Sequence, residues 1–300
     1  MAKAVPGRFS ETLYPSYRQE FDFSGDAIID EKSEYQSILL FDNEALGRVL
    51  VLDGNVQITD RDEAAYSEML VHPAVYEHGD VKSVLIIGGG DGAVAEEVLK
   101  HETIETCDLC EIDPRVIGLA REHLGSVNKG VFDHPKFTLH LKDASDLIAD
   151  PQRQSAYDLV ISDRPDPVGP GQALFTEQFY QNCKNVLAPG GLAIFQTGVP
   201  FFQAEELVEA LTHLQKVFPQ SGVLLTVVPT YVGGFMALTW GGNGLALGTP
   251  DGIAGADRNF SARPVDTDYY TPALHGAAFA LPRWIERLVE AAAPPPTTAP

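Results

Sequence analysis

The chain has 300 residues, a formal net charge of −21, and apolar (44%) and aromatic (9%) fractions that are ordinary for a globular protein. This length suits one large domain or two modest ones, and no apolar run approaches the roughly 20 residues that a membrane-spanning helix needs. So strong a negative charge disfavours nucleic acid as a partner, because phosphates repel an acidic surface, and it is compatible with a cationic substrate.

The N-terminus and the cysteines predict a cytoplasmic protein without disulfides or metal. The first residues contain no continuous apolar core of a signal peptide. Three cysteines do not make a disulfide framework. Cys107 and Cys110 form a C-x-x-C pair on a predicted strand, where residues three apart point to opposite faces. His72, His101 and His275 lack the spacing of metal ligands, so we expect them to be packing or surface residues.

The N-terminal part has the pattern of a β-meander. Between residues 27 and 59, short runs rich in β-branched residues are separated by Asp, Asn, Glu and Gly. A helix is predicted over residues 61–76, with Tyr66 among the residues at helical spacing. We therefore predict a small N-terminal β-strand domain over residues 1–75, with this bridging helix at its end.

From residue 81 onward, strands alternate with helices of about 10 to 15 residues, which is typical of βαβ units. This predicts an α/β fold over residues 76–290, with a Rossmann-like, doubly wound sheet of the class I methyltransferase type. Residues 241–265 are rich in Gly and Ala and are predicted to be a flexible connection. Residues 269–288 carry aromatic side chains and leucines that we expect to dock on the body. The tail, 291–300, is predicted to be disordered.

A glycine-rich turn, LIIGGGDGA, follows the first of these strands. Gly88, Gly90 and Gly92 allow close backbone approach or positive φ. Glu111 ends the next strand, about 20 residues on, where a carboxylate can accept hydrogen bonds from both ribose hydroxyls. Asp91 lies within the turn, where it would repel a pyrophosphate and attract a sulfonium or an ammonium. The pattern therefore favours an S-adenosyl cofactor over a dinucleotide.

Further carboxylates follow two later strands. Asp143 lies where an adenine amino group could bind, and the same spacing fits a helix N-cap, so both interpretations remain open. Asp163 and Asp166 end another strand in ISDRPDPVGPG, a turn stiffened by prolines. With Asp91 they would converge on one small volume, which costs repulsion unless a cation fills it. An ordinary Asp-Pro turn is the alternative interpretation.

Together these segments resemble the spermidine synthases of the polyamine aminopropyltransferase family. The resemblance covers nearly all of residues 10–290 and includes EYQSILLFDN, GRVLVLDGNVQITDRDEAAYSEM, LIIGGGDGA, CEID, D-x-x-D-P-x-G-P, LFTEQFY, VPTYVGGFM and HGAAFALP. It implies transfer of the aminopropyl group of decarboxylated S-adenosylmethionine to an amine, with release of methylthioadenosine. It also implies a homodimer or homotetramer. Because the displacement is direct and the leaving thioether is neutral, we expect no prosthetic group and no metal.

The resemblance also implies roles for individual residues. Asp163 would be the general base, and Asp91 would bind the aminopropyl ammonium. The residues that would bind the nucleoside are Gln36, Gly88, Gly90, Glu111, Asp143, Ala144 and Pro170. The residues that would position the acceptor amine or contact it are Tyr66, Ser67, Asp166 and Tyr231.

Four sites depart from the usual family pattern: Ser67, Ala144, the Arg164–Pro165 pair and Glu96. Ser67 stands where His or Gln is common, and Arg164 stands where small polar residues are typical. The acceptor is therefore left open, with putrescine as the first expectation and agmatine, cadaverine, diaminopropane or spermidine as alternatives. Ala144 replaces a usual Gly, and its methyl group is tolerable if φ is negative.

Two other functional classes compete with this prediction. An S-adenosylmethionine-dependent N-methyltransferase would share the same sheet, but the N-terminal meander, Asp91 and the paired turn aspartates argue against it. Methyl transfer would release S-adenosylhomocysteine, whereas aminopropyl transfer would release methylthioadenosine. A catalytically silent homologue that acts as a binding subunit is the third class, and the filled catalytic positions argue against it.

Overall fold

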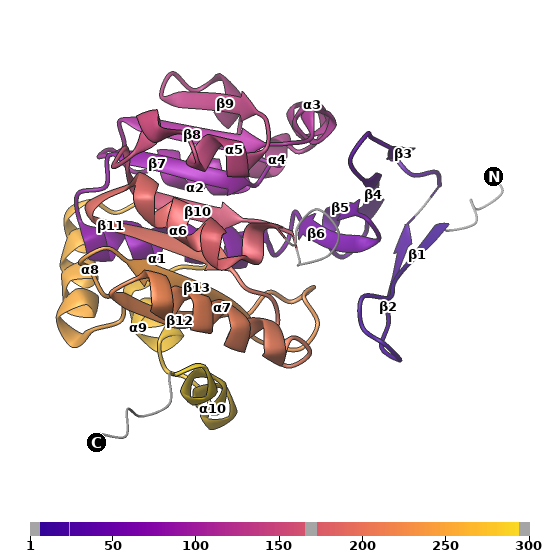
Figure 1. The fold of residues 1–300 in the computed structure, drawn as a ribbon. Helices are drawn as coiled ribbons and strands as arrows, with labels where there is room; N and C mark the ends of the chain where they lie inside the picture. Colours follow the sequence, from indigo (N-terminus) through magenta and orange to yellow (C-terminus); the bar gives the residue numbers. More distant parts are fainter. Residues whose placement is uncertain (1–6, 24, 166–172, 294–300) are drawn as a thin grey trace.

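The computed structural model describes residues 7–23, 25–165 and 173–293, which form three β-sheets and the helices packed on them (Figure 1). A two-stranded hairpin that the sequence pattern did not predict comes first. It is followed by a four-stranded antiparallel sheet in chain order, which confirms the predicted meander. The strands of these two sheets are β1 (Gly7–Glu11), β2 (Gln19–Phe23), β3 (Ile29–Lys32), β4 (Ser37–Asn43), β5 (Gly47–Leu52) and β6 (Asn55–Thr59).

Helix α1 (Glu63–His78) links the meander to the main domain and lies inside the molecule. Its residues from Ala65 to Glu77 are buried, so it is covered on all sides rather than amphipathic. It packs against helices α2 (Ala93–Leu99) and α8 (Pro250–Ala262) and against the main sheet. Gly79 ends it in the left-handed conformation, with φ +82°, a conformation that glycine adopts readily.

The main sheet has seven strands in the order β12-β13-β11-β10-β7-β8-β9, with β13 antiparallel to both of its neighbours. Strands β7 and β10 are adjacent and parallel, and the chain winds outward from them in both directions. This confirms the predicted doubly wound, Rossmann-like sheet, and its switch point lies between β7 and β10. The strands are β7 (Ser83–Gly88), β8 (Thr106–Glu111), β9 (Phe137–Leu141), β10 (Tyr157–Asp163), β11 (Leu187–Gln196), β12 (Gln220–Thr226) and β13 (Met236–Gly242).

Helices cover both faces of this sheet. Figure 1 shows α6 and α7 in front of it and α1 and α8 behind it, and the contacts of α5 with α6 and of α2 with α1 place those helices on the same two sides. Helix α10 packs on α7. The remaining helices are α3 (Pro114–His123), α4 (Gly125–Asn128), α5 (Ala144–Ile148), α6 (Glu177–Val186), α7 (Ala204–Val217), α9 (Pro272–Ala278) and α10 (Arg283–Ala292).

The prediction of a flexible connection over residues 241–265 was wrong. Helix α8 occupies half of it, starting at Pro250 with the Thr249 side chain as N-cap. A Cβ on Gly252 would come within 2.1 Å of Glu77 Oε2, so this glycine permits close packing on α1. The glycines of residues 241–265 were interpreted as a sign of flexibility, but a helix that packs closely on another helix also needs small residues.

The C-terminal segment docks on α1 through buried carboxylates, as predicted for residues 269–288. Glu68 accepts hydrogen bonds from the backbone N–H groups of Asp268 (2.7 Å) and Tyr269 (3.0 Å). Glu77 pairs with His275 at 2.8 Å. Helix α10 ends at Ala292, two residues into the predicted disordered tail, and residues 294–300 of that tail lie outside the described part.

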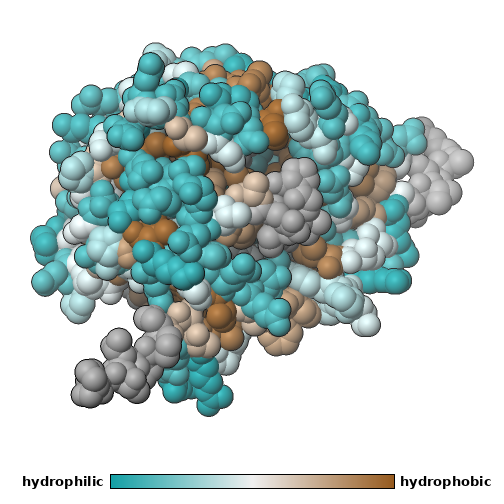
Figure 2. Space-filling model, viewed as in Figure 1, coloured by the Kyte–Doolittle hydropathy of each residue, from teal (hydrophilic) through white to brown (hydrophobic). Residues whose placement is uncertain are grey.

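The face of the molecule that Figure 2 shows is largely hydrophilic. Figure 2 shows mostly polar residues on the viewed face, with small hydrophobic areas between them. Among the described residues, no helix combines the length and apolarity required to cross a bilayer.

Candidate active site

A cavity of about 420 Å³ lies at the carboxyl ends of the central strands. Its walls come from the turn after β7, from the ends of β8 and β10, from the meander and from helix α1. The predicted site residues that line it are Gln36, Tyr66, Ser67, Gly88, Gly90, Asp91, Glu111, Asp143, Ala144, Asp163 and Tyr231. The fold therefore brings these eleven predicted residues, from seven segments of the chain, to one cavity.

Two predicted residues, Asp166 and Pro170, lie outside the described residues. Their implied roles remain predictions.

The glycine turn is required by the closeness of β7 to β10. Gly88 has φ +79°, and a Cβ there would lie 2.0 Å from the backbone oxygen of Asp163. Gly90 faces Glu111, whose Oε2 would be 2.8 Å from an added Cβ. Any side chain at these positions would push the turn away from the two carboxylates, so glycine is what allows the cavity floor to form.

Asp163 lies at the end of β10, within hydrogen-bonding distance of helix α1. The Tyr66 hydroxyl donates to Asp163 Oδ1 at 2.6 Å. Burial, together with the negative charge of Asp91, raises the pKa of Asp163 to about 7. Burial also raises the pKa of Tyr66 well above its usual value, so the phenol stays protonated and remains a donor. The site thus holds a carboxylate that can take up a proton near neutral pH.

Asp91 lines the cavity beside the start of α2. Its Oδ1 accepts a hydrogen bond from the backbone N–H of Ala93 at 2.8 Å, at the start of α2. Burial raises its pKa. A buried carboxylate beside Asp163 is costly when both are ionised, and a bound ammonium would remove that cost.

The side of the cavity that is predicted to bind the nucleoside is organised by Asp113, which the sequence interpretation did not single out. Asp113 caps helix α3 and accepts hydrogen bonds from Gln36 Nε2 (2.9 Å) and Ser33 Oγ (2.6 Å). It therefore holds Gln36 of the meander against the main domain. Beside it, Glu111 accepts the Asp113 N–H at 2.8 Å, and burial raises the pKa of Glu111 to about 7.

Asp143 is the helix N-cap that one interpretation of its spacing predicted, and its role toward adenine remains a prediction. Its Oδ1 accepts the N–H of Ser145 at 2.7 Å, which makes it the N-cap of α5, and it also lines the cavity. Ala144 begins that helix, and its backbone φ is not positive. The alanine in place of the usual glycine is therefore accommodated without backbone strain.

The side of the cavity that is predicted to bind the acceptor combines aromatic and polar groups. The rings of Tyr66 and Tyr231 meet edge to face, with centroids 5.8 Å apart, and the Tyr231 hydroxyl donates to the backbone oxygen of Gln57. Ser67 is buried and donates to Glu63 Oε2 at 3.0 Å. Burial raises the pKa of Glu63 to about 7. Ser67 thus brings a further carboxyl group close behind the cavity wall.

Asp62 connects this wall to the rest of the cavity and was not foreseen. It is buried and accepts hydrogen bonds from the N–H (2.9 Å) and Oγ1 (2.8 Å) of Thr230, the residue before Tyr231. Asp62 also precedes the first turn of α1, which carries Tyr66. One side chain therefore sets the relative positions of the two tyrosines.

Glu11 is the third residue that sequence reasoning missed, after Asp113 and Asp62. It comes from β1, is only 6% exposed, lines the cavity, and accepts the N–H of Val56 at 2.8 Å and a hydrogen bond from Gln19. A single acidic residue in an unpredicted hairpin carries no signal in one sequence. Its place at the site depends on how the hairpin folds onto the meander.

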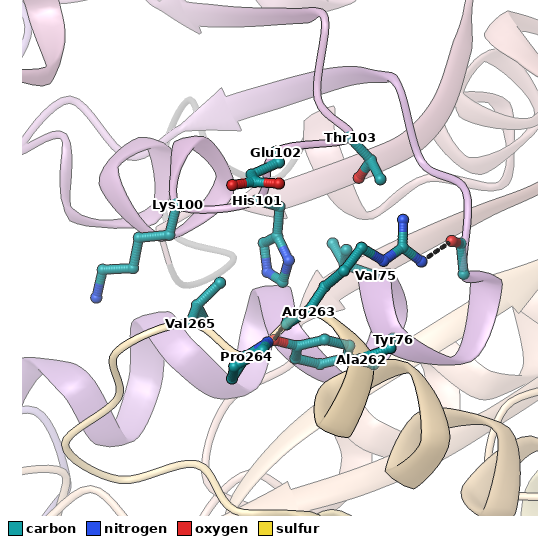
Figure 3. Close-up of a pocket in the computed structure, with 11 residues that line it drawn as sticks. Val75, Tyr76, Lys100, His101, Glu102, Thr103, Ala262, Arg263, Pro264 and Val265 are labelled. Atoms are coloured by element: carbon teal, nitrogen blue, oxygen red, sulfur yellow. Dashed lines mark hydrogen bonds between the residues drawn. The ribbon is translucent and has the colours of Figure 1, made fainter.

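His72, His101 and His275 are buried, which agrees with their predicted packing role, and Cys107 and Cys110 are buried as well. Cys107 and Cys110 belong to different apolar clusters on opposite faces of β8. His101 lines a separate hollow of about 220 Å³ between α1 and residues 262–265 (Figure 3). Burial lowers the pKa of His72 and His101 to about 3, so both rings are neutral. No group of three or more His, Cys, Asp or Glu suited to a metal ion occurs within the described ranges.

Comparison with known proteins gives a consistent result. The family model described as "Spermine/spermidine synthase domain" matches residues 63–246, and "Spermidine synthase tetramerisation domain" matches residues 25–60. The polyamine aminopropyltransferase of Salmonella paratyphi B is 41% identical over 281 residues, covering 94% of this chain and 97% of that protein. The counterpart from Salmonella newport is 40% identical over 282 residues, with the same coverage.

Solved structures agree with the sequence comparison. A spermidine synthase in complex with the transition-state analogue AdoDATO superposes with a TM-score of 0.89 and 32% identity, over 97% of this chain and 98% of that one. Spermidine synthase from Thermotoga maritima gives a TM-score of 0.87 and 31% identity, over 97% of each chain.

Proposed function

The chain belongs to the spermine/spermidine synthase family of polyamine aminopropyltransferases, and from this premise we propose that it transfers the aminopropyl group of decarboxylated S-adenosylmethionine to a diamine. Putrescine is the proposed acceptor, which would give spermidine and methylthioadenosine. The AdoDATO complex of a related spermidine synthase supports a donor of this type. The match of residues 25–60 to a tetramerisation domain supports a homo-oligomer.

The observation that carries the proposal is the charge of the cavity. Among its described lining residues, six are acidic and two are basic. The acidic residues are Glu11, Asp53, Asp91, Glu111, Asp143 and Asp163. Lys142 is exposed, and Arg164 directs its guanidinium to backbone carbonyls and a tyrosine hydroxyl. Such a cavity favours cationic reactants, which both the sulfonium donor and a protonated diamine are.

The residues support a direct displacement. The amine nitrogen attacks the aminopropyl carbon next to sulfur while the carbon–sulfur bond breaks, and the bonding pair returns to sulfur as a neutral thioether. The nitrogen loses a proton, which Asp163 accepts. Tyr66 holds the carboxylate in place, and the cavity supplies orientation and negative potential.

The pH dependence of the rate tests the base. With its pKa raised to about 7, Asp163 is unprotonated, and so active, only as the pH rises through that value. We expect kcat/KM for the amine to bend near pH 7, with a roughly tenfold loss per unit of pH on the acid side. For Asp163→Asn we expect no bend near pH 7. Its kcat/KM should instead rise continuously with pH toward the pKa of the amine itself, about 10. Identical pH profiles for the wild type and this variant would argue against the assignment.

Glu11 is proposed to bind the second ammonium group of the diamine. It reaches the cavity from β1, whereas Asp163 comes from β10, so two carboxylates on separate elements match the two nitrogens of the acceptor. We expect Glu11→Gln to raise the KM for putrescine by about 10- to 30-fold, the effect of leaving a buried ammonium unpaired, with kcat changed less. Glu20→Gln, an exposed acid on the same hairpin, is the matched control. Equal KM values for both variants would remove Glu11 from this role.

The acceptor and the reaction are tested together by product analysis. Decarboxylated S-adenosylmethionine is supplied with putrescine, cadaverine, agmatine, diaminopropane or spermidine, and the products are identified by mass spectrometry. Methylthioadenosine with an aminopropylated amine is the expected result, with putrescine the best acceptor. Release of S-adenosylhomocysteine from S-adenosylmethionine, without aminopropyl transfer, would instead identify an N-methyltransferase.

A further inference from the structure

We infer that Arg164 is a positioning residue for the reaction: its buried guanidinium connects two parts of the cavity wall to helix α6 and holds Asp163 in register with the donor side. The kinetic effects that this inference predicts rest on the proposed function. It deepens that function by assigning a role to a side chain that donates its hydrogen bonds to other parts of the protein. The sequence interpretation connected Arg164 with the choice of acceptor, and that connection remains a prediction.

Arg164 makes three hydrogen bonds to three different segments. Its Nε donates to the backbone oxygen of Gln196 at 3.2 Å, at the end of β11. Its Nη2 donates to the Tyr180 hydroxyl at 2.9 Å, on α6, and its Nη1 donates to the backbone oxygen of Leu174. Gln196 and Leu174 line the cavity, as Arg164 itself does. One planar group therefore fixes the distances between two wall segments and helix α6.

The surroundings of this guanidinium are aromatic. The Arg164 Cζ lies 3.6 Å from the ring centroid of Phe175 and 5.3 Å, 5.5 Å and 5.7 Å from those of Tyr180, Phe195 and Phe179. The residue is 2% exposed. Within the described ranges no carboxylate pairs with it. A buried cation held by rings and carbonyls costs desolvation, so it is an unusual choice for stability alone.

The position of Asp163 depends directly on its neighbour. The backbone oxygen of Asp163 packs so closely on Gly88 that an added Cβ would approach to 2.0 Å, which leaves the strand end no room to shift toward β7. Arg164 holds the same strand end from the other side, through β11 and α6. Leu174 packs against the apolar cluster that contains Ala144, on the predicted adenine side. Movement of Arg164 would therefore disturb both the base and the nucleoside wall.

The experiment compares Arg164→Met, Arg164→Lys and Tyr180→Phe with the wild-type protein. Arg164→Met keeps the length without donors, Arg164→Lys keeps the charge without the planar fork, and Tyr180→Phe removes one acceptor but keeps the ring. Arg153→Met is the matched control, because Arg153 bonds Asp108 and Tyr157 at the opposite end of β10. Each variant is assayed for kcat and both KM values, for thermal unfolding, and for methylthioadenosine binding by calorimetry.

We expect Arg164→Met to lower kcat/KM by about tenfold or more, because small misplacements of reacting groups have large kinetic effects. Its Kd for methylthioadenosine should rise by about fivefold, within the range for residues that act on a ligand indirectly. Arg164→Lys should be intermediate, Tyr180→Phe milder, and Arg153→Met unchanged in kcat/KM. All measurements are made well below the unfolding temperature of each variant.

Values of kcat/KM and Kd within twofold of wild type for both Arg164 variants would overturn the inference, and so would an equal loss in Arg153→Met. If Arg164→Met does not fold, Arg164→Lys and Tyr180→Phe decide the question. An unaffected rate in a protein that makes the aminopropylated product contradicts only this inference. Absence of that product in the wild type contradicts the proposed function and, with it, the kinetic role of Arg164.

Discussion

Asp163→Asn is expected to lower kcat by at least about 100-fold, the effect of losing a general base. Asparagine has the same shape and can still accept the hydrogen bond from Tyr66, but it cannot take the proton from the attacking amine. The measurement is methylthioadenosine release at saturating donor and putrescine, followed over several pH values.

The fold of this variant should remain intact. Asn removes a buried negative charge whose pKa is raised by burial and by Asp91, so the unfolding temperature should stay the same or rise. Asp158→Asn is the matched control on the same strand, because Asp158 accepts hydrogen bonds from Lys82 and Ser83 at the other end of β10. A kcat for Asp163→Asn close to that of Asp158→Asn would exclude Asp163 as the base.

Asp91→Asn is expected to weaken donor binding strongly and to relax its selectivity. Truncating one side of a buried charge pair costs about 2 to 5 kcal/mol, so the KM for the decarboxylated donor should rise by about 30-fold or more. S-adenosylmethionine carries an additional α-carboxylate, which the Asp91 charge would repel. The ratio of the inhibition constant of S-adenosylmethionine to the donor KM should therefore fall.

The control for this prediction is Asp146→Asn, which removes an exposed acid on α5 that does not line the cavity. It should leave both constants unchanged. Because the Asp91 side chain also accepts the N–H of Ala93, Asp91→Asn retains an acceptor for the start of α2. Unchanged discrimination against S-adenosylmethionine in Asp91→Asn would refute the repulsion argument, even if donor affinity fell.

Much of the main domain could be predicted because its signals are local. The alternation of apolar strands and amphipathic helices follows from the two backbone periods, and it predicted the order of elements from β7 to β13. In such a sheet the carboxyl ends of parallel strands share one edge. The position of Asp91, Glu111 and Asp163 at strand ends was therefore enough to place them together.

The errors share a cause, which is that a residue's partner was distant in sequence. Gly252 indicated flexibility until its contact with Glu77 was known. The β1–β2 hairpin was missed, and with it Glu11, because its position depends on contacts with the meander rather than on its own pattern. The direction of side chains could not be predicted either. Nothing near Arg164 in the sequence indicates that its guanidinium donates hydrogen bonds to Gln196 and Tyr180.

The amino-acid sequence by itself determined the doubly wound sheet, the glycine turn and the acidic strand ends, because periodicity, glycine conformation and strand direction are properties of short segments. Tertiary structure alone decided which groups complete the cavity. Asp62, Glu11 and Arg164 each bond at least one partner more than 30 residues away, and burial beside Asp91 raises the pKa of Asp163. Burial and long-range contact are properties of the packed chain, so no short segment encodes them.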